Sequence, residues 1–283
     1  MMVFMKRNLK LFFRDRSAVL FSLLAVFIII ALYAVFLGDV WLDSMKALAN
    51  VDFLMNTWLV AGLLAVASVT TTMGAFGVMI EDKVKKIDKD FYSSPIKRSS
   101  LTGGYLGSAL LIGIIMSLVT FAAAEIYIVL SGGAWLDAVS CLKIVLLIFL
   151  STLMNTSLVC FIVSFINSNQ AFSTVSTIIG TLIGFFTGIY LPIGSLPASV
   201  QTLIKVFPPS HAAALFRQVL MEAPMQTSFN GIPVQYLNEF KYHMGVTYSF
   251  GGHEITPLVS ILILIGTSAV FYGLSILNMS GKR

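Results

Sequence analysis

The stretch LMNTWLVAGLLAVASVTTTMGAFGVMI, residues 54–80, carries no charged side chain. A bilayer core of about 30 Å is crossed by about 20 helical residues, so this stretch is long enough to span a membrane with some tilt. Five further apolar runs lie at 18–37, 101–130, 138–166, 171–191 and 257–277. Only 11 % of the 283 residues are charged, against roughly 25 % in soluble domains. The sequence therefore predicts an all-α integral membrane protein with six transmembrane helices in one domain, 1–283.

Lysine and arginine are distributed unevenly over the segments between these runs. Of the 18 basic residues, 13 lie in the N-terminal segment, in the loop 81–100 or at the C-terminus, and five on the other side. Basic residues are retained on the cytoplasmic side of a membrane. Both termini and the loop 81–100 are therefore predicted to be cytoplasmic, at the plasma membrane, and the segment 192–256 extracellular. The net charge of +5 reflects this topology, so a nucleic-acid partner is not expected.

Several shorter segments are too polar or too short to span. Residues 4–16 mix apolar and basic side chains, which favours a helix lying in the headgroup plane, with a plain topology anchor as the alternative. Residues 196–207 and 210–221 are apolar-rich stretches broken by Pro208 and Pro209, a pattern that indicates a re-entrant hairpin. Helical spacing from Val234 to Met244 predicts an amphipathic helix that covers the outer surface.

Motifs of catalysis, metal binding and nucleotide binding are missing from the sequence. The three histidines, His211, His243 and His253, have no metal-type spacing, and the phosphate-binding pattern GxxxxGK[ST] does not occur. Cys141 and Cys160 lie 19 residues apart in one run, roughly 28 Å along a helix, so they cannot form a disulfide with each other. We predict no catalytic residue, no metal site and no cofactor on this chain, so any use of ATP needs a second protein.

Two features inside the runs are candidates for function. Glu125 is the clearest ionisable residue within a span and lies near its outer end; it is either a hydrogen-bonded interfacial acid or part of a transport pathway. In the fifth run small residues recur every three or four positions, namely Ser173, Thr177, Gly180, Gly184 and Gly188. Such residues let helices approach closely. They pack either against another span of the chain or against a partner subunit beside a translocation path.

The loop 81–100 combines many charges with an apolar stripe at Val84, Ile87 and Phe91, followed by Pro95. This pattern predicts a short amphipathic helix that ends at the proline. Its aromatic residues suit a protein interface, although the helix could instead anchor the loop on the membrane surface.

Three motifs, in order along the chain, resemble the type-2 export permeases of ATP-binding-cassette transporters. The first is KRNLK at 6–10 with Arg14 and Asp15, which resembles an interfacial helix. The second is the loop that starts with Glu81 and Asp82, ends in DFYSSPIKR at 90–98 and is followed by Gly104 and Tyr105. The third is GIYLP at 188–192, then LP at 196–197, FPPSH at 207–211 and Arg217.

The resemblance implies a half-channel that pairs with a second permease, identical or related, and with two cytoplasmic ATPase subunits that bind ATP and magnesium. The helix at 87–94 is then the coupling helix, and its contact residues are Asp82, Ile87, Asp90, Phe91, Tyr92 and Pro95. The re-entrant hairpin is marked by Pro192, Pro197, Pro208, Pro209, His211 and Arg217. Many members have a Gly-Thr-like pair where this chain has Lys86 and Ile87.

The function expected from this resemblance is outward transport, by a permease subunit, of a lipophilic or amphipathic cargo such as a drug, an antibiotic, a peptide or a lipid. Export of a polysaccharide or a lipid-linked glycan is the main alternative. A membrane-embedded enzyme and a channel or scaffold protein are kept as further alternatives.

Overall fold

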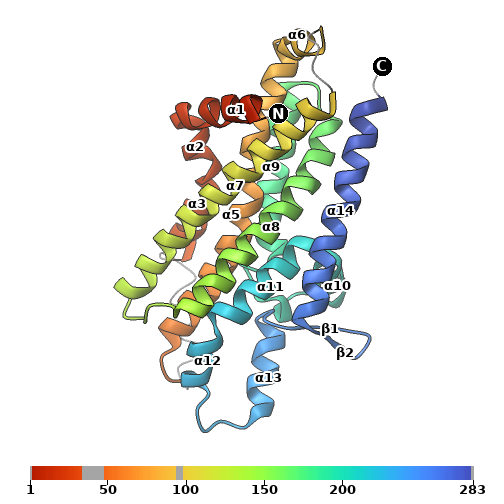
Figure 1. The fold of residues 1–283 in the computed structure, drawn as a ribbon. Coiled ribbons are helices and arrows are strands. Elements are labelled where there is room, and N and C mark those ends of the chain that lie inside the picture. Colours follow the sequence, from red (N-terminus) through yellow and green to blue (C-terminus); the bar gives the residue numbers. More distant parts are fainter. Residues whose placement is uncertain (1, 34–47, 94–97, 282–283) are drawn as a thin grey trace.

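The computed structural model describes residues 2–33, 48–93 and 98–281, and these residues are almost entirely helical (Figure 1). Among these described residues, four helices are long and apolar enough to cross a membrane. They are α5 (Val51–Val84), α7 (Arg98–Leu130), α8 (Ala138–Ser164) and α14 (Pro257–Gly281). The second, third, fourth and sixth predicted runs therefore form helices of spanning length, and the prediction of an essentially all-α membrane protein agrees with the structure.

The first and fifth runs form shorter helices. The first contains α2 (Arg16–Ser22) and α3 (Leu24–Leu32), and its predicted end at 34–37 lies outside the described residues. The fifth forms α9 (Asn169–Phe186), which ends five residues before the predicted Leu191. Gly188 adopts φ +65°, a left-handed conformation that ends a helix. Whether these two runs span the membrane stays a prediction.

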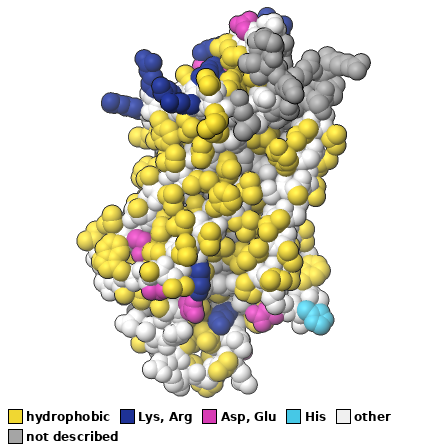
Figure 2. Space-filling model, in the orientation of Figure 1, with side chains coloured by type: hydrophobic (Ala, Val, Ile, Leu, Met, Phe, Trp, Pro, Cys, Tyr) yellow, Lys and Arg dark blue, Asp and Glu magenta, His cyan; other side chains and the backbone are white. Residues whose placement is uncertain are grey.

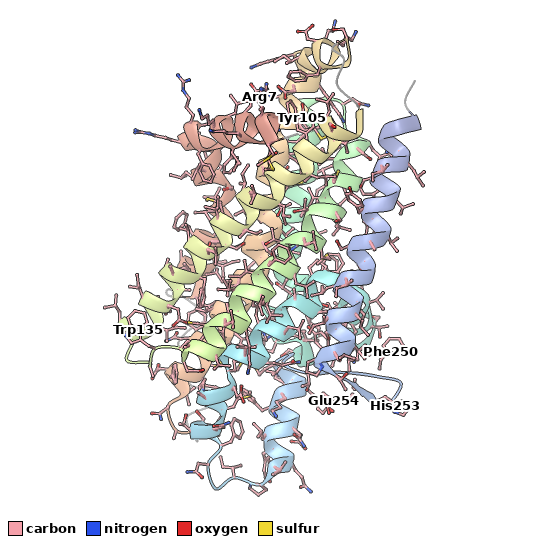
Figure 3. All side chains as sticks on the ribbon, viewed as in Figure 1. Arg7, Tyr105, Trp135, Phe250, His253 and Glu254 are labelled. Atoms are coloured by element: carbon pink, nitrogen blue, oxygen red, sulfur yellow. The ribbon has the colours of Figure 1, made fainter. Side chains whose placement is uncertain are left out.

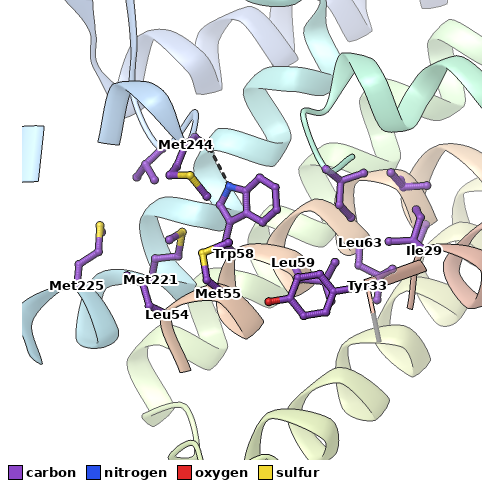
Figure 4. Close-up of a cluster of buried hydrophobic side chains, with 14 of the residues drawn as sticks. Ile29, Tyr33, Leu54, Met55, Trp58, Leu59, Leu63, Met221, Met225 and Met244 are labelled. Atoms are coloured by element: carbon purple, nitrogen blue, oxygen red, sulfur yellow. Dashed lines mark hydrogen bonds between the residues drawn. The ribbon is translucent and has the colours of Figure 1, made fainter. Parts of the chain in front are cut away.

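Helix α5 is the central element of the bundle. It packs against α7, α8 and α9, and against α11 (Pro208–Leu220), and most of its side chains are buried on every side. Trp58, the largest fully buried side chain, lies in one of its apolar clusters together with Met55 and Met244 (Figure 4). Because α5 is covered all round, its sequence is apolar without a clear polar face.

The remaining elements lie at the two ends of the bundle. Helix α1 (Met2–Arg14) lies crosswise at one end of the bundle, and α6 (Ile87–Ser93) and the last turns of α14 lie at the same end (Figure 1). Helices α12 (Glu222–Ser228) and α13 (Val234–His243) lie at the opposite end. We call these the α6 end and the α13 end.

The surface between the two ends is largely apolar. In Figure 2 hydrophobic side chains cover the middle of the molecule, and Lys and Arg gather above all at the α6 end. Leu142 and Leu146 of α8 and Leu262 of α14 are among the large hydrophobic side chains that are exposed. An exposed apolar surface of this extent is expected where lipid replaces water.

Prolines mark the helix starts of the segment that was predicted to be re-entrant. The short turn η2 (Ile193–Ser195) follows Pro192, α10 (Ala198–Val206) follows Pro197, and α11 begins at Pro208 and Pro209. Proline is favoured there because the first helical N–H groups have no partner inside the helix. After α13 the chain forms a hairpin of β1 (Tyr248–Phe250) and β2 (His253–Ile255), with Tyr248 opposite Ile255, and then enters α14.

Candidate functional site

An ion pair at the α6 end joins α1 to α5. Arg7 donates from Nη1 to Asp82 Oδ2 at 2.7 Å and from Nη2 to Asp82 Oδ1 at 2.8 Å. Tyr105 of α7 donates its hydroxyl to the same Oδ2 at 2.7 Å, and Asp82 is only 3 % exposed. The hydrogen bonds that Arg7 donates to Asp82 raise the pKa of the Arg7 guanidinium, so it stays charged. Two-pronged, charge-assisted bonds of this kind are strong and fix orientation, so three helices meet here in one geometry.

Glycines on α7 let α1 lie close to it. An added Cβ on Gly104 would overlap the Phe4 ring, and one on Gly107 would overlap Met5 Sδ. The fully buried Asn8 donates to Ser108 Oγ at 3.3 Å, a second polar contact between α1 and α7.

Aromatic rings connect this ion pair to α6. Phe4 makes edge-to-face contacts with Phe91 of α6, centroid to centroid at 5.1 Å, and with Tyr105, at 4.8 Å. The Arg7 guanidinium lies 5.3 Å from the Phe91 ring centre, within the range of a cation–π contact. We call Phe4, Arg7, Asp82, Phe91 and Tyr105 the corner cluster; Figure 3 labels Arg7 and Tyr105 at this end. Through it α6 is joined to α1, α5 and α7.

The structure brings together only part of the predicted coupling set. Asp82 and Phe91 belong to the corner cluster, Ile87 is half-buried at the start of α6, and Asp90 is exposed. Tyr92 belongs to α6, but its side chain, like the whole of Pro95, lies outside the described residues. Lys86, where φ is +60°, separates α5 from α6. A short helix therefore follows α5 where the loop pattern predicted one, after α5 has continued four residues beyond Ile80.

Two adjoining hollows form a groove along α5. One, of about 820 Å³, is bordered by residues 18–28 of α2 and α3, by 70–77 of α5 and by 172–181 of α9, with Tyr190. The other, of about 510 Å³, shares Ala18, Gly74 and Gly77 with it and extends to residues 11–14 of α1 and to Glu81, toward the α6 end. Its polar lining comes from Arg14, Asp15, Glu81 and Asn169. The groove thus has a charged mouth and a mostly apolar body.

The small residues of α9 serve two different purposes. Thr177 and Gly180 line the groove, and a Cβ on Gly180 would meet nothing within 4 Å. Gly184 is buried, and a Cβ there would overlap the ring of Tyr190. Gly188 is buried in its left-handed conformation beside Ile193. The small residues toward the α13 end, Gly184 and Gly188, therefore pack within the chain. Those toward the α6 end, Thr177 and Gly180, face open space.

Two residues of the predicted hairpin are fully buried polar groups. His211 donates from Nε2 to the Lys205 carbonyl at 2.9 Å, and its Nδ1 lies 3.1 Å from Ser260 Oγ of α14. Arg217 contacts carbonyl oxygens of two segments and the Trp58 ring, as described below. Both side chains join α11 to neighbouring elements.

Glu125 has a local partner. It is buried near the end of α7, and its Oε2 accepts from the Leu136 backbone N–H at 3.2 Å, in the loop before α8. The groove lining does not include it. Cys141 and Cys160 are both free, as predicted, but only Cys160 is buried.

Sequence reasoning did not assign a role to Phe4, Arg7 or Tyr105, although these residues lie inside or next to the quoted motifs. The available signal was an acid, Asp82, at the end of one apolar run and an arginine, Arg7, in a basic segment predicted to lie at the same membrane face. That they meet depends on the crosswise course of α1, which periodicity does not specify.

The helices of spanning length and their apolar surface define an integral membrane protein, with a groove along one side and a structured corner at one end. Residues 1–221 match the family model described as ABC-2 type transporter, and the chain belongs to this family. It is therefore a membrane permease of the ABC type, a class that works with an ABC ATPase. Comparison with curated proteins and with solved structures gives no significant match.

Proposed function

We propose that this chain is the permease subunit of an ATP-driven exporter, which moves a lipophilic or amphipathic cargo outward across the plasma membrane. Two copies of a cytoplasmic ATPase bind ATP and magnesium and supply the energy, and a second permease, identical or related, completes the channel. Family membership supports the class of transporter. The corner cluster is the observation that carries the proposal for this chain.

The corner cluster supports a coupling role for α6. This helix stands at the tip of the molecule, where a cytoplasmic partner has access to it (Figure 1). A displacement of α6 is transmitted to Phe4 of α1 through the Phe91 ring. It is transmitted to the ends of α5 and α7 through the Arg7–Asp82–Tyr105 hydrogen bonds. Because charge-assisted bonds in a buried site resist distortion, the three helices respond together.

In this proposal the α6 end is cytoplasmic. The excess of Lys and Arg there follows the rule for cytoplasmic segments. The chain begins in α1 at this end and α14 finishes there, which agrees with an even number of crossings (Figure 1). The runs at 18–37 and 171–191 complete six transmembrane segments, α1 lies in the headgroup layer, and α10 and α11 form the re-entrant hairpin.

The groove supports an amphipathic cargo. Its body presents Phe21, Leu24, Ile28 and Met73, which suit an apolar moiety. Its mouth presents Arg14, Asp15 and Glu81, which suit a polar or charged group at the cytoplasmic face. A second permease placed against the exposed face of α9 would close the groove into a channel.

One observation favours the alternative, a glycan cargo. Hydroxyl side chains line the groove on two helices, with Thr70 on α5 and Ser173, Thr177 and Thr181 on α9. Three of these hydroxyls donate to carbonyls of their own helix, at Val66, Ser173 and Thr177, which leaves their oxygens as acceptors.

The experiment is to reconstitute the permease with its ATPase in lipid nanodiscs and to measure ATP hydrolysis against a panel of amphipathic compounds and lipid-linked glycans. We expect amphipathic compounds to stimulate hydrolysis, and Thr177→Trp, which fills the groove, to abolish that stimulation without lowering basal hydrolysis. Stimulation by glycans alone would select the alternative. Stimulation that survives Thr177→Trp would show that the groove is not the cargo path.

A further inference from the structure

Arg217 is a fully buried cation, with an exposed fraction of 0 %. Among the described residues no carboxylate forms an ion pair with it. Its Nη2 donates to the carbonyls of Thr187, at 2.9 Å, and Gly188, at 3.1 Å, and its Nη1 to the carbonyl of Gly245, at 3.3 Å. Burying a charge without partners is very unfavourable. The three carbonyls compensate for the hydration that the guanidinium loses. The Trp58 ring, whose centre lies 5.0 Å from Arg217 Cζ, adds a cation–π contact.

The first pair of carbonyls belongs to the end of α9. Thr187 is the C-cap of that helix, and its carbonyl is among the last ones, which find no partner inside a helix. The helix dipole makes this end partially negative, which favours a cation. The guanidinium therefore stabilises the end of α9 by both hydrogen bonding and charge.

The other carbonyl belongs to a turn that three side chains hold. Trp58 of α5 donates to the Met244 carbonyl at 2.9 Å (Figure 4). Gln218 of α11 donates to the Val246 carbonyl at 2.8 Å, on the other side of Gly245. Gly245 has φ +69°, and a Cβ there would lie 2.5 Å from Ile193 Cδ1. The turn belongs to residues 222–256, which we call the cap and which follow the segment matched by the family. Of these three side chains, only Arg217 also donates hydrogen bonds to carbonyls at the end of α9.

Helix α9 is held unevenly along its length. Its buried residues, Ile183 and Gly184, lie in its last turn, next to Arg217. Toward the α6 end, Ser173 and Thr177 are exposed along the groove, and only one face packs on the core, through residues such as Phe172 and Val175. Within this chain, then, α9 is firmly attached at one end.

We propose that Arg217 is a positioning residue that fixes the outer end of α9 to α5, α11 and the cap, so that α9 swings about this end and the groove widens at its cytoplasmic mouth. The direction of swing rests on the proposed function. The attachment itself does not, because it concerns only contacts within the chain.

The attachment is tested by hydrogen exchange on the purified full-length chain, read at two sets of amides. One set is 187–189 at the end of α9, and the other is 244–246 in the cap turn; all six donate backbone hydrogen bonds. Arg217→Met should raise exchange in both sets by roughly tenfold, because both lose a charged donor. The matched control Gln218→Ala should raise exchange in the cap turn and leave 187–189 unchanged.

Unchanged exchange at 187–189 in Arg217→Met, or an equal rise there in Gln218→Ala, would overturn the proposal. If Arg217→Met does not fold, Arg217→Lys takes its place. A single ammonium cannot reach both segments, so a smaller rise in both sets is expected, and a rise in neither would contradict the attachment.

The swing is tested in the assembled transporter, with spin labels at Thr177 and Leu191 on each permease and distances measured with and without ATP. We expect the distance between Thr177 labels to change more than that between Leu191 labels, and Arg217→Lys to enlarge the change at Leu191. Equal movement at both positions would overturn the swing. No ATP-driven movement at either position, with the exchange result intact, would instead count against the proposed transport function.

Discussion

Arg7 and Asp82 are separated by 75 positions in the chain, and their side chains meet in a two-pronged ion pair with N–O distances of 2.7 and 2.8 Å. The pair joins the crosswise helix α1 to the end of the central helix α5, next to the Phe4–Phe91 contact that holds α6. A protein partner on α6 would therefore act on the whole α6 end of the bundle.

Arg7→Ala should lower the free energy of unfolding by on the order of 2 kcal/mol, because the buried Asp82 carboxylate loses both charged donors. Arg7 is partly exposed, so the loss is smaller than for a completely buried pair. Thermal unfolding in detergent micelles checks the prediction. Lys10→Ala, an exposed change on the same helix, is the control and should have no effect. Equal stability of Arg7→Ala and Lys10→Ala would show that the pair contributes nothing.

Phe91→Ala should leave membrane insertion and folding intact but separate ATP hydrolysis from transport, because α6 loses its ring contact with Phe4. We expect transport per ATP hydrolysed to fall roughly tenfold, as for an aromatic anchor at an interface. Transport and hydrolysis are measured together in vesicles. Ser93→Ala, at an exposed position of the same helix, should retain coupling. Normal coupling in Phe91→Ala would remove this residue from the coupling role.

The two glycines of α9 should respond differently to substitution. Gly184→Ala forces a methyl group into the Tyr190 ring and should destabilise the fold by about 1–3 kcal/mol. In Gly180→Leu the new side chain points into open space, so the melting temperature should not change. Assembly with the second permease, or transport, should be lost. Size-exclusion chromatography, thermal unfolding and transport assays separate the two effects. A stable Gly184→Ala protein, or a fully active Gly180→Leu complex, would contradict the corresponding half of the prediction.

Glu125→Gln tests whether this acid belongs to the pathway. The amide oxygen of Gln can still accept from the Leu136 N–H, so stability and transport should stay close to those of the unchanged protein. Glu125→Leu removes the acceptor from a partly buried N–H and should destabilise the fold by about 1 kcal/mol. The readouts are thermal unfolding and transport. If Glu125→Gln folds normally but does not transport, Glu125 takes part in the pathway after all.

Hydropathy predicted the long helices well because each apolar run must be covered by lipid or protein over its whole length. The start of α8 at Ala138 and that of α14 at Pro257 match the predicted starts, and the flanking Asp137, the N-cap of α8, marks the first of them. The end of α9 was predicted too late, because the apolar residues Ile189–Leu191 continue the run after Gly188 has already turned the chain. Hydropathy cannot detect such a turn.

The candidate site was predictable in part. Asp82 and Phe91 were identified from the motif around α6, but Arg7 and Tyr105 join them only through the packing of α1 on α7, which Gly104 and Gly107 permit. For Arg217, the sequence placed the residue in the hairpin and could not reveal its partners. Those partners are backbone carbonyls, at Thr187, Gly188 and Gly245, and a carbonyl has no side-chain signature.

The measurement that tests the central claim most directly is recovery of the ATPase partner through α6. The tagged chain is purified from its own membranes in a gentle detergent, the bound proteins are identified by mass spectrometry, and ATP hydrolysis is measured, for the unchanged chain and for Asp90→Arg, which reverses an exposed charge on α6. We expect an ATP-binding-cassette ATPase to copurify with the unchanged chain, and Asp90→Arg to lose it while folding normally. A chain that purifies without any ATPase, or an ATPase that stays bound to Asp90→Arg with full activity, would contradict the assignment of α6 as the coupling element.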